Sequence, residues 1–142
     1  MRDLLTAGLT ALDLDPAAAD KLARYAELLL EKNKVMNLTA ITVPHDVATL
    51  HLLDCAALAA QLDLSGKRVI DVGTGAGFPG MVLAILTPDA RFTLLDSLGK
   101  RVDFLKEVQT DLGLKNVTCV HARAEAVSYT HLRAHETCAD LV

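Results

Sequence analysis

Apolar side chains recur at helical spacing through the first 62 residues. One stripe is formed by Leu5, Leu9 and Leu12, and a second by Leu22, Tyr25, Ala26 and Leu29. Both repeat every three to four residues, as on one face of an amphipathic helix. Asp15 followed by Pro16 marks the start of the second helix, because the carboxylate can cap it and proline suits its first turn. This helix is expected to run to about Lys34.

The segment from Asn37 to Thr42 is rich in β-branched and capping residues and interrupts the helical pattern. A third helix is expected from Pro44 to about Leu62. Its apolar stripe is formed by Leu50, Leu53, Ala57 and Leu58. Residues 1–62 are therefore predicted to form an all-helical subdomain.

From Lys67 onward, short apolar runs alternate with helical segments. Strands are expected at 68–72, 91–95 and 117–120, with helices between them at 79–86 and about 104–112. The runs have the continuous apolar character of buried parallel strands, and Gly113 is placed to end the second helix. This alternation makes up half of a doubly wound sheet, so the predicted fold class is α/β.

A glycine-rich turn joins the first strand to the helix after it. It reads Asp71-Val72-Gly73-Thr74-Gly75-Ala76-Gly77-Phe78-Pro79-Gly80. Glycine lets the backbone turn sharply and lets a ligand approach with no Cβ in the way. Asp96 closes the second strand, near the roughly 20-residue offset at which an acidic side chain meets a nucleotide ribose. The combination predicts a nucleotide-type ligand, with a purely structural turn as the alternative.

The spacing alone leaves the ligand open, because Gly75 to Gly80 also satisfies the dinucleotide pattern G-x-G-x-x-G. Two residues argue against NAD or FAD. Pro79 lacks the N–H that would face a pyrophosphate at the first helical turn, and Asp71 would bring a carboxylate close to two phosphates. S-adenosyl-L-methionine has no phosphate and carries an ammonium and a sulfonium, so we favour it over a dinucleotide.

Composition and charge restrict the class further. The chain has 142 residues, 51% hydrophobic and 23% charged, with a formal net charge of −4. These values exclude a disordered chain and disfavour a generic nucleic-acid binder. No stretch reaches the roughly 18–20 apolar residues of a membrane span, and the cysteines lack metal-ligand spacing. The acidic N-terminal segment predicts that there is no secretory signal. We expect a cytoplasmic protein with no membrane or DNA partner and no metal.

Four sequence blocks carry a family resemblance. They are Asn33-Lys34-Val35-Met36-Asn37-Leu38-Thr39, His51-Leu52-Leu53-Asp54, the glycine-rich turn, and Leu94-Leu95-Asp96-Ser97-Leu98-Gly99-Lys100-Arg101. In this order they resemble the bacterial glucose-inhibited division protein B family, methyltransferases that modify guanine N7 in 16S ribosomal RNA. The resemblance covers residues 1 to about 127. Lys32 stands where the family usually has Trp, and Cys55 stands where the family often has Ser.

The resemblance implies a Rossmann-like sheet that binds S-adenosyl-L-methionine. The residues it implies for the cofactor are Asp71 near the methionine end, Gly73, Gly75, Gly77 and Phe78 along it, Asp96 on both ribose hydroxyls, and Ala124 and Glu125 on the adenine side. Glu125 also follows from topology, because the end of the third strand faces the same crevice. The implied partner is 16S ribosomal RNA or the small ribosomal subunit, bound by a monomer.

Methylation of guanine N7 demands little of side chains. This nitrogen has an exposed lone pair, so the transfer needs positioning and desolvation rather than a strong base. We therefore expect no catalytic acid or base. Lys100, Arg101 and Arg123 are candidate contacts to RNA phosphates, with solvated surface charge as the alternative.

Polar residues of the helical region are expected to be structural. His51 and Asp54, at i and i+3, could pair and tie the helical subdomain to the sheet, although a gate over the cofactor cleft is the alternative. Asn33 and Asn37 are expected to cap backbone groups rather than to contact RNA.

Residues 128–142 match neither region. They show no strand alternation, and they resemble a translated sequencing adaptor, so we expect a non-native tail. A metal site of His131, His135 and Cys138 is the alternative. The predicted organisation is a helical subdomain at 1–62, the first half of a cofactor-binding domain at 63–127, and this tail.

Only three strands of the sheet are expected in this chain. Val69, Ile70 and Val72 of the first strand would then lie on an exposed apolar edge, which favours aggregation. We expect an incomplete fragment that folds poorly and is inactive by itself. An NAD(P)-binding oxidoreductase fragment and a non-catalytic RNA-binding remnant are kept as alternative functions.

Overall fold

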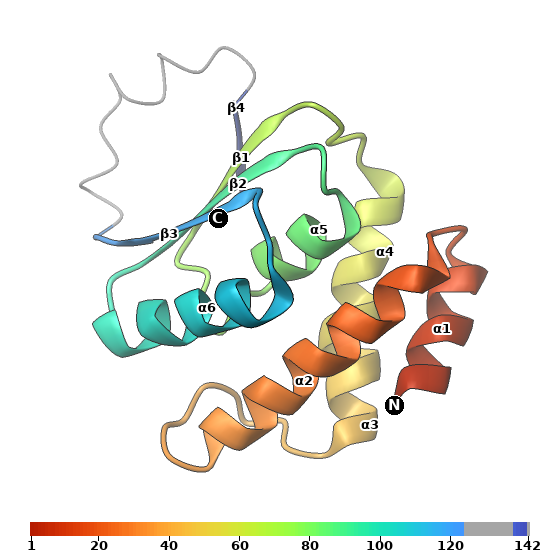
Figure 1. The fold of residues 1–142 in the computed structure, drawn as a ribbon, viewed down its shortest axis with the longest axis horizontal. Coiled ribbons are helices and arrows are strands. Elements are labelled where there is room, and N and C mark those ends of the chain that lie inside the picture. The colour runs from red at the N-terminus through yellow and green to blue at the C-terminus, as the bar shows by residue number, and fades with distance from the viewer. Residues whose placement is uncertain (124–137, 142) are drawn as a thin grey trace.

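The N-terminal helices pack as a layer beside the sheet (Figure 1). The computed structural model describes residues 1–123 and 138–141. Helix α1 spans Arg2–Ala11, the short 3-10 helix η1 spans Pro16–Ala18 and α2 spans Ala19–Asn33. The Asp15 side chain caps η1 by accepting a hydrogen bond from the Ala17 N–H at 2.9 Å. The predicted helix start is confirmed, as is the burial of both stripes apart from the half-buried Leu12.

The third predicted helix is continuous but changes its winding. Helix α3 spans Pro44–Asp46, the π-helical segment η2 spans Val47–Leu53 and α4 spans Asp54–Gln61. Its buried face consists of Val47, Ala48, Leu52 and Ala56. Leu50, which the predicted stripe included, is 56% exposed. A π-turn winds more widely than an α-helix, so a stripe extrapolated at α-helical spacing identified the wrong face.

The sheet is parallel, with strand order β3-β2-β1-β4. The strands are β1 (Arg68–Val72), β2 (Arg91–Asp96), β3 (Val117–His121) and β4 (Cys138–Leu141). Helix α5 (Gly80–Leu86) connects β1 to β2, and α6 (Gly99–Leu112) connects β2 to β3. Gly113 ends α6 in the left-handed conformation at φ +64°, as predicted. The α/β class and its Rossmann-like alternation are confirmed.

The fourth strand corrects the expectation of three. Strand β4 lies in the predicted tail and pairs in parallel with β1, from Arg68 opposite Cys138 to Asp71 opposite Leu141. Strand β1 is therefore paired on both sides, and the predicted exposed edge at Val69 and Ile70 is wrong. Parallel pairing uses backbone N–H and C=O groups, which nearly every residue has. It therefore needs no alternation of side chains.

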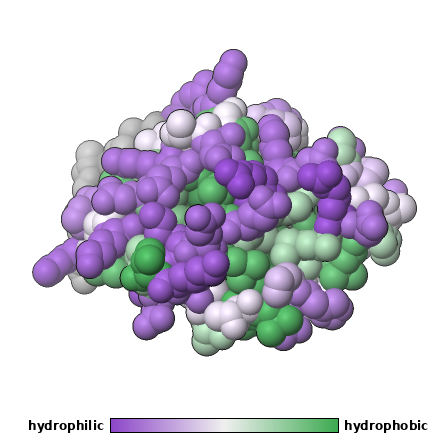
Figure 2. Space-filling view, turned by 60° about the horizontal axis from the view of Figure 1, so that its bottom comes forward, coloured by the Kyte–Doolittle hydropathy of each residue, from purple (hydrophilic) through white to green (hydrophobic). Residues whose placement is uncertain are grey.

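One apolar core extends from the helical layer to the sheet and includes Tyr25, Phe92 and Phe104. On the face shown in Figure 2, hydrophilic side chains cover most of the surface, with apolar side chains in patches between them. Among the described residues, no helix has the length and apolar character needed to cross a bilayer.

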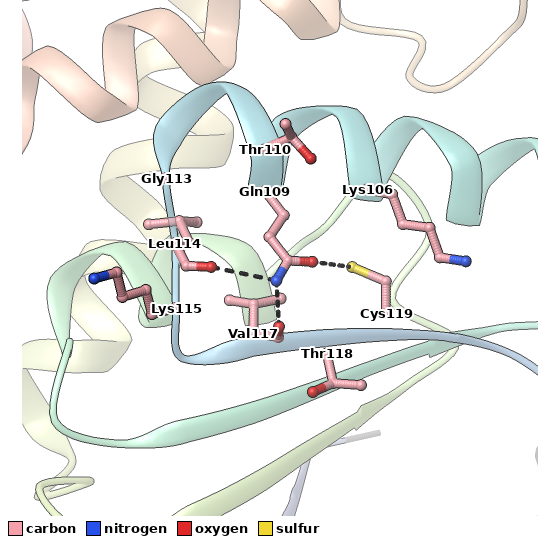
Figure 3. A pocket seen from close by; sticks show the side chains of 9 residues that line it. All are labelled: Lys106, Gln109, Thr110, Gly113, Leu114, Lys115, Val117, Thr118 and Cys119. Carbon is pink, nitrogen blue, oxygen red and sulfur yellow. Dashed lines mark hydrogen bonds between the residues drawn. The ribbon is translucent and has the colours of Figure 1, made fainter.

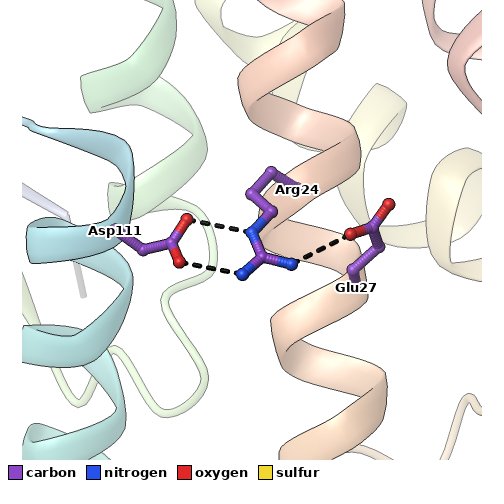
Figure 4. A network of polar contacts seen from close by, with 3 residues as sticks. All are labelled: Arg24, Glu27 and Asp111. Atoms are coloured by element: carbon purple, nitrogen blue, oxygen red, sulfur yellow. Dashed lines mark hydrogen bonds and ion pairs between the residues drawn. The ribbon is translucent and has the colours of Figure 1, made fainter.

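Ion pairs link α2 to α6 on the surface (Figure 4). The Arg24 guanidinium donates two hydrogen bonds of 2.9 Å to Asp111 and one of 3.1 Å to Glu27. Lys32, at the position where the chain departs from the family's usual Trp, lies 3.3 Å from Glu107. The hydrogen bonds from Arg24 lower the pKa of Asp111.

Candidate functional site

The glycine-rich turn leaves β1 at the carboxyl edge of the sheet, beside the end of β2. Gly73 and Gly75 adopt φ values of +70° and +62°, and a Cβ added at either would meet nothing within 4 Å. The N–H of Gly73 and that of Thr74 both donate to the Leu95 carbonyl, at 2.8 and 3.1 Å. The turn is thus fastened to β2, with an open side at Gly73 and Gly75 that a ligand can approach.

The second half of the turn faces the protein. A Cβ added at Gly77 would lie 2.5 Å from the Tyr25 hydroxyl, and one at Gly80 would lie 2.6 Å from Asp71 Oδ2. The buried Tyr25 hydroxyl of α2 donates to the Ala76 carbonyl. Gly77 therefore lets α2 and α6 pack closely against the turn, and Gly80 lets the start of α5 pack closely against β1 and β2.

Phe78 points toward the helical layer. Its ring stacks on His51 of η2, with centroids 4.4 Å apart and planes 12° apart. His51 Nε2 lies 2.8 Å from Thr39 Oγ1, and burial lowers the pKa of the His51 imidazole. His51 thus connects the helical layer to the turn through Phe78, and its hydrogen-bond partner is Thr39 rather than Asp54. The i, i+3 expectation assumed α-helical winding, which η2 lacks.

Asn33 holds the loop that carries Thr39. Its Oδ1 accepts hydrogen bonds from the Leu38 N–H at 2.7 Å and the Thr39 N–H at 3.0 Å. The backbone-capping role predicted for Asn33 is confirmed.

Asp71 is 2% exposed, and two of its hydrogen bonds come from within the turn and the start of α5. Its Oδ2 accepts from Thr74 Oγ1 at 2.7 Å and from the Gly80 N–H at 2.9 Å. The first turn of α5 therefore faces the carboxylate of Asp71. In dinucleotide-binding folds, N–H groups at this position face a pyrophosphate. The geometry is unfavourable for a dinucleotide, and the contact of Asp71 with a methionine moiety stays a prediction.

Asp96 joins the glycine-rich turn to the start of α6. Its Oδ2 accepts from the Gly75 N–H and its Oδ1 from the Leu98 N–H, both at 2.9 Å. Arg101 Nη1 lies 3.6 Å from Oδ1. The structure thus brings together Gly75, Asp96 and Arg101 from the predicted set.

The end of β3 lies at the same edge. The Ala122 N–H donates to the Asp96 carbonyl at 3.0 Å, and the exposed Arg123 follows it. Lys100 is exposed in the first turn of α6. Ala124 and Glu125 lie outside the described residues, as do His131 and His135. Within the described parts of the chain, no cluster of His, Cys, Asp and Glu could hold a metal ion.

Two residues at this edge were not singled out as site residues from the sequence. Tyr25 was assigned to the apolar stripe of α2, although a buried tyrosine hydroxyl needs a partner, and that need was the available signal. His121 ends β3, and its Nε2 lies 3.0 Å from the Ser97 carbonyl. No local pattern marked His121, because its partner belongs to another loop.

A surface groove lies away from this edge, between α6 and β3 (Figure 3). It is lined by Lys106, Gln109, Thr110, Gly113, Leu114, Lys115, Val117, Thr118 and Cys119. The Gln109 amide donates to the Leu114 and Val117 carbonyls, at 3.2 and 2.5 Å. Its carbonyl lies 3.7 Å from Cys119 Sγ, and burial raises the pKa of this thiol to about 11. The groove contains none of the predicted site residues.

The fold is a Rossmann-like α/β domain, defined by the parallel sheet, the glycine-rich turn after β1 and the acid that closes β2. Domains of this class bind ligands at the carboxyl edge of the strands. The model of the family described as rRNA small subunit methyltransferase G matches residues 18–141. The chain therefore belongs to the rRNA small subunit methyltransferase G family. This confirms the resemblance noted in the sequence.

Individual relatives agree with this assignment. Ribosomal RNA small subunit methyltransferase G of Salmonella agona is 52% identical over 105 residues, 74% of this chain and 50% of that protein. The protein of the same name from Yersinia pseudotuberculosis serotype O:3 is 49% identical over 123 residues, 87% of this chain and 57% of that protein. The chain thus spans about half the length of the curated relatives it matches.

A SAM-dependent methyltransferase from Aquifex aeolicus is 27% identical and covers 66% of this chain and 47% of its own, with a TM-score of 0.49.

Proposed function

We propose that this chain is the cofactor-binding part of an S-adenosyl-L-methionine-dependent methyltransferase that acts on N7 of a guanine in 16S ribosomal RNA. The observation that carries the proposal is the edge site of Gly73, Gly75 and Asp96 in a member of the rRNA small subunit methyltransferase G family. Guanine N7 comes from the sequence resemblance. The partner is 16S ribosomal RNA or the small ribosomal subunit, and the protein acts in the cytoplasm as a monomer.

The residues present fit this cofactor better than a dinucleotide. An ionised carboxylate has about four acceptor positions, and the Gly75 and Leu98 N–H groups use two of those on Asp96. The remaining positions match the two hydroxyls of a ribose. At the neighbouring helix start, Asp71 already accepts from the Gly80 N–H, which suits a ligand without phosphate.

When bound, S-adenosyl-L-methionine supplies an activated methyl group, so the chain's own residues have to bind and orient. Gly73 and Gly75 let the ligand reach the backbone, and Asp96 fixes the ribose. Gly77, Phe78 and Asp71 support the turn from within, and they are also proposed to line the cofactor, with Asp71 near its methionine end. No side chain is assigned as acid or base, because positioning is the larger demand of this reaction.

Other surface groups complete the proposed site. Lys100 and Arg123, exposed at the rim, contact RNA phosphates. Ala124 and Glu125 follow β3 and are proposed for the adenine side.

Equilibrium binding tests the proposal directly. The 142-residue chain, with its fold checked by circular dichroism, is titrated calorimetrically with S-adenosylhomocysteine and separately with NAD. Binding of S-adenosylhomocysteine without binding of NAD is expected. Preference for NAD would support the oxidoreductase alternative, and binding of ribosomal RNA with neither ligand would support the non-catalytic alternative.

A matched pair of glycines localises the site. Gly75→Ala and Gly113→Ala both place a Cβ at a positive φ with open space around it, so the backbone strain is similar. Gly75→Ala is expected to weaken S-adenosylhomocysteine binding at least tenfold, whereas Gly113→Ala, at the far end of α6, leaves it unchanged. Equal effects of the two substitutions would remove the glycine-rich turn from the proposed site.

A further inference from the structure

Two adjacent basic residues at the start of α6 have different surroundings. Arg101 Nη1 lies 3.6 Å from Asp96 Oδ1, and the Arg101 side chain is 39% exposed. Lys100 is exposed and makes no hydrogen bond or ion pair with any described residue. Sequence reasoning grouped both as RNA contacts, because a local pattern cannot show which of two neighbouring cations faces the site.

Arg101 faces a carboxylate that is only 3% exposed. At 3.6 Å its guanidinium acts on Asp96 through charge, while the two hydrogen bonds of 2.9 Å come from backbone N–H groups. A distance of 3.6 Å is too long for a good hydrogen bond, so Arg101 leaves the remaining acceptor positions of Asp96 available. A guanidinium in this position attracts the Asp96 carboxylate toward the start of α6, and an ionised carboxylate can accept hydrogen bonds from two hydroxyls.

We propose that Arg101 is a positioning residue of the cofactor site that orients the Asp96 carboxylate for a ribose diol, and that Lys100 alone of this pair faces RNA. The inference rests on the proposed cofactor. Under this proposal, Arg101 affects cofactor binding even when no RNA is present. A residue that only contacted an RNA phosphate would not do so.

The test measures S-adenosylhomocysteine binding to the full chain by calorimetry with no RNA present. Arg101→Gln is expected to weaken binding about fivefold to tenfold, and Arg101→Lys, which keeps the charge, to restore much of the loss. Lys100→Gln is expected to bind as the wild type does. Lys106→Gln removes the same charge from an exposed position on the same helix, and it is also expected to have no effect.

A double-mutant cycle with Asp96→Asn separates positioning from general electrostatics. In the Asp96→Asn background, Arg101→Gln is expected to cause no further loss. Unchanged or tighter binding by Arg101→Gln, or an equal loss in both backgrounds, would overturn the inference. Absence of S-adenosylhomocysteine binding by the wild-type chain would instead refute the proposed function, so the two failures are distinguishable.

Discussion

The two halves of the glycine-rich turn use glycine for different physical reasons. In the outer half, Gly73 and Gly75 need a left-handed backbone and have open space where a Cβ would be. In the inner half, an added Cβ at Gly80 would meet Leu94 and Asp71. The outer half thus leaves open space beside the backbone, whereas the inner half is closely packed. Equal spacing in a motif does not imply an equal role for its glycines.

The largest expected effect is at Gly80. Gly80→Ala places a Cβ 2.6 Å from Asp71 Oδ2 in a buried site, and overpacking of this kind costs about 3 kcal/mol. Urea unfolding followed by circular dichroism measures the change. Gly66→Ala is the control, since it has positive φ but open space and is expected to cost only about 1 kcal/mol. Similar losses in both variants would contradict the packing role of Gly80.

Tyr25→Phe tests how the helical layer supports the turn. The variant keeps the buried ring but leaves the Ala76 carbonyl without the hydroxyl donor, and loss of such a bond costs about 1–2 kcal/mol. The free energy of unfolding is measured in urea. An unchanged unfolding midpoint would show that the hydroxyl does not support the turn.

Gly75→Ala is expected to lower the free energy of unfolding by about 1 kcal/mol, because its strain is confined to one left-handed residue. Thermal unfolding with and without saturating S-adenosylhomocysteine measures both the loss of stability and the loss of ligand binding. The ligand-induced rise in Tm should be lost in this variant and kept in Gly113→Ala. A loss of stability as large as that of Gly80→Ala would erase the distinction between the two halves.

His51 makes stability depend on pH. Burial lowers its pKa below the ordinary value of 6.5, so the unfolded chain binds a proton first as the pH falls. The free energy of unfolding should therefore decrease as the pH is lowered below about 6.5. His51→Gln is expected to flatten this dependence. Equal slopes in the wild-type protein and the variant would contradict the prediction.

The smallest effect is expected at the surface pair of Arg24 and Asp111. Because the hydrogen bond from Arg24 lowers the pKa of Asp111, the stabilisation is present above the ordinary value of 3.8 and is lost as the pH falls through the lowered value. A double-mutant cycle of Arg24→Gln and Asp111→Asn should show a small coupling that decreases at high salt. Coupling that persists at high salt would indicate a role beyond surface electrostatics.

Local patterns predicted most of the fold. The stripe of Leu5 and Leu9, the Asp15 cap and the ending of α6 at Gly113 follow from spacing and residue type within a few positions. The burial of Ala48 and Leu52 in place of Leu50 did not follow, because the π-helical winding of η2 has no simple signal in the sequence. Strand β4 was also missed, since its pairing with β1 depends on backbone groups.

The candidate site was also predicted only in part, because local patterns identify its position but not its side-chain contacts. A strand, a glycine-rich turn and Asp96 at the next strand end identify the edge of the sheet by local order alone. The pairing of Arg101 with Asp96 and the stacking of Phe78 on His51 were not predicted. Both depend on side-chain directions that are settled by packing.

By itself the sequence determined the α/β class, the family and the position of the glycine-rich turn, because these follow from periodicity, from the order of the sequence blocks and from glycine's freedom at positive φ. Only the tertiary structure decided which groups face inward. Asp71 and Asp96 both belong to strands that end at this edge, yet one holds the first turn of α5 and the other joins two loops. Tyr25 reaches Ala76 across 51 positions of the chain. Such contacts depend on how the helical layer packs against the glycine-rich turn and against α5 and α6, which no local pattern encodes.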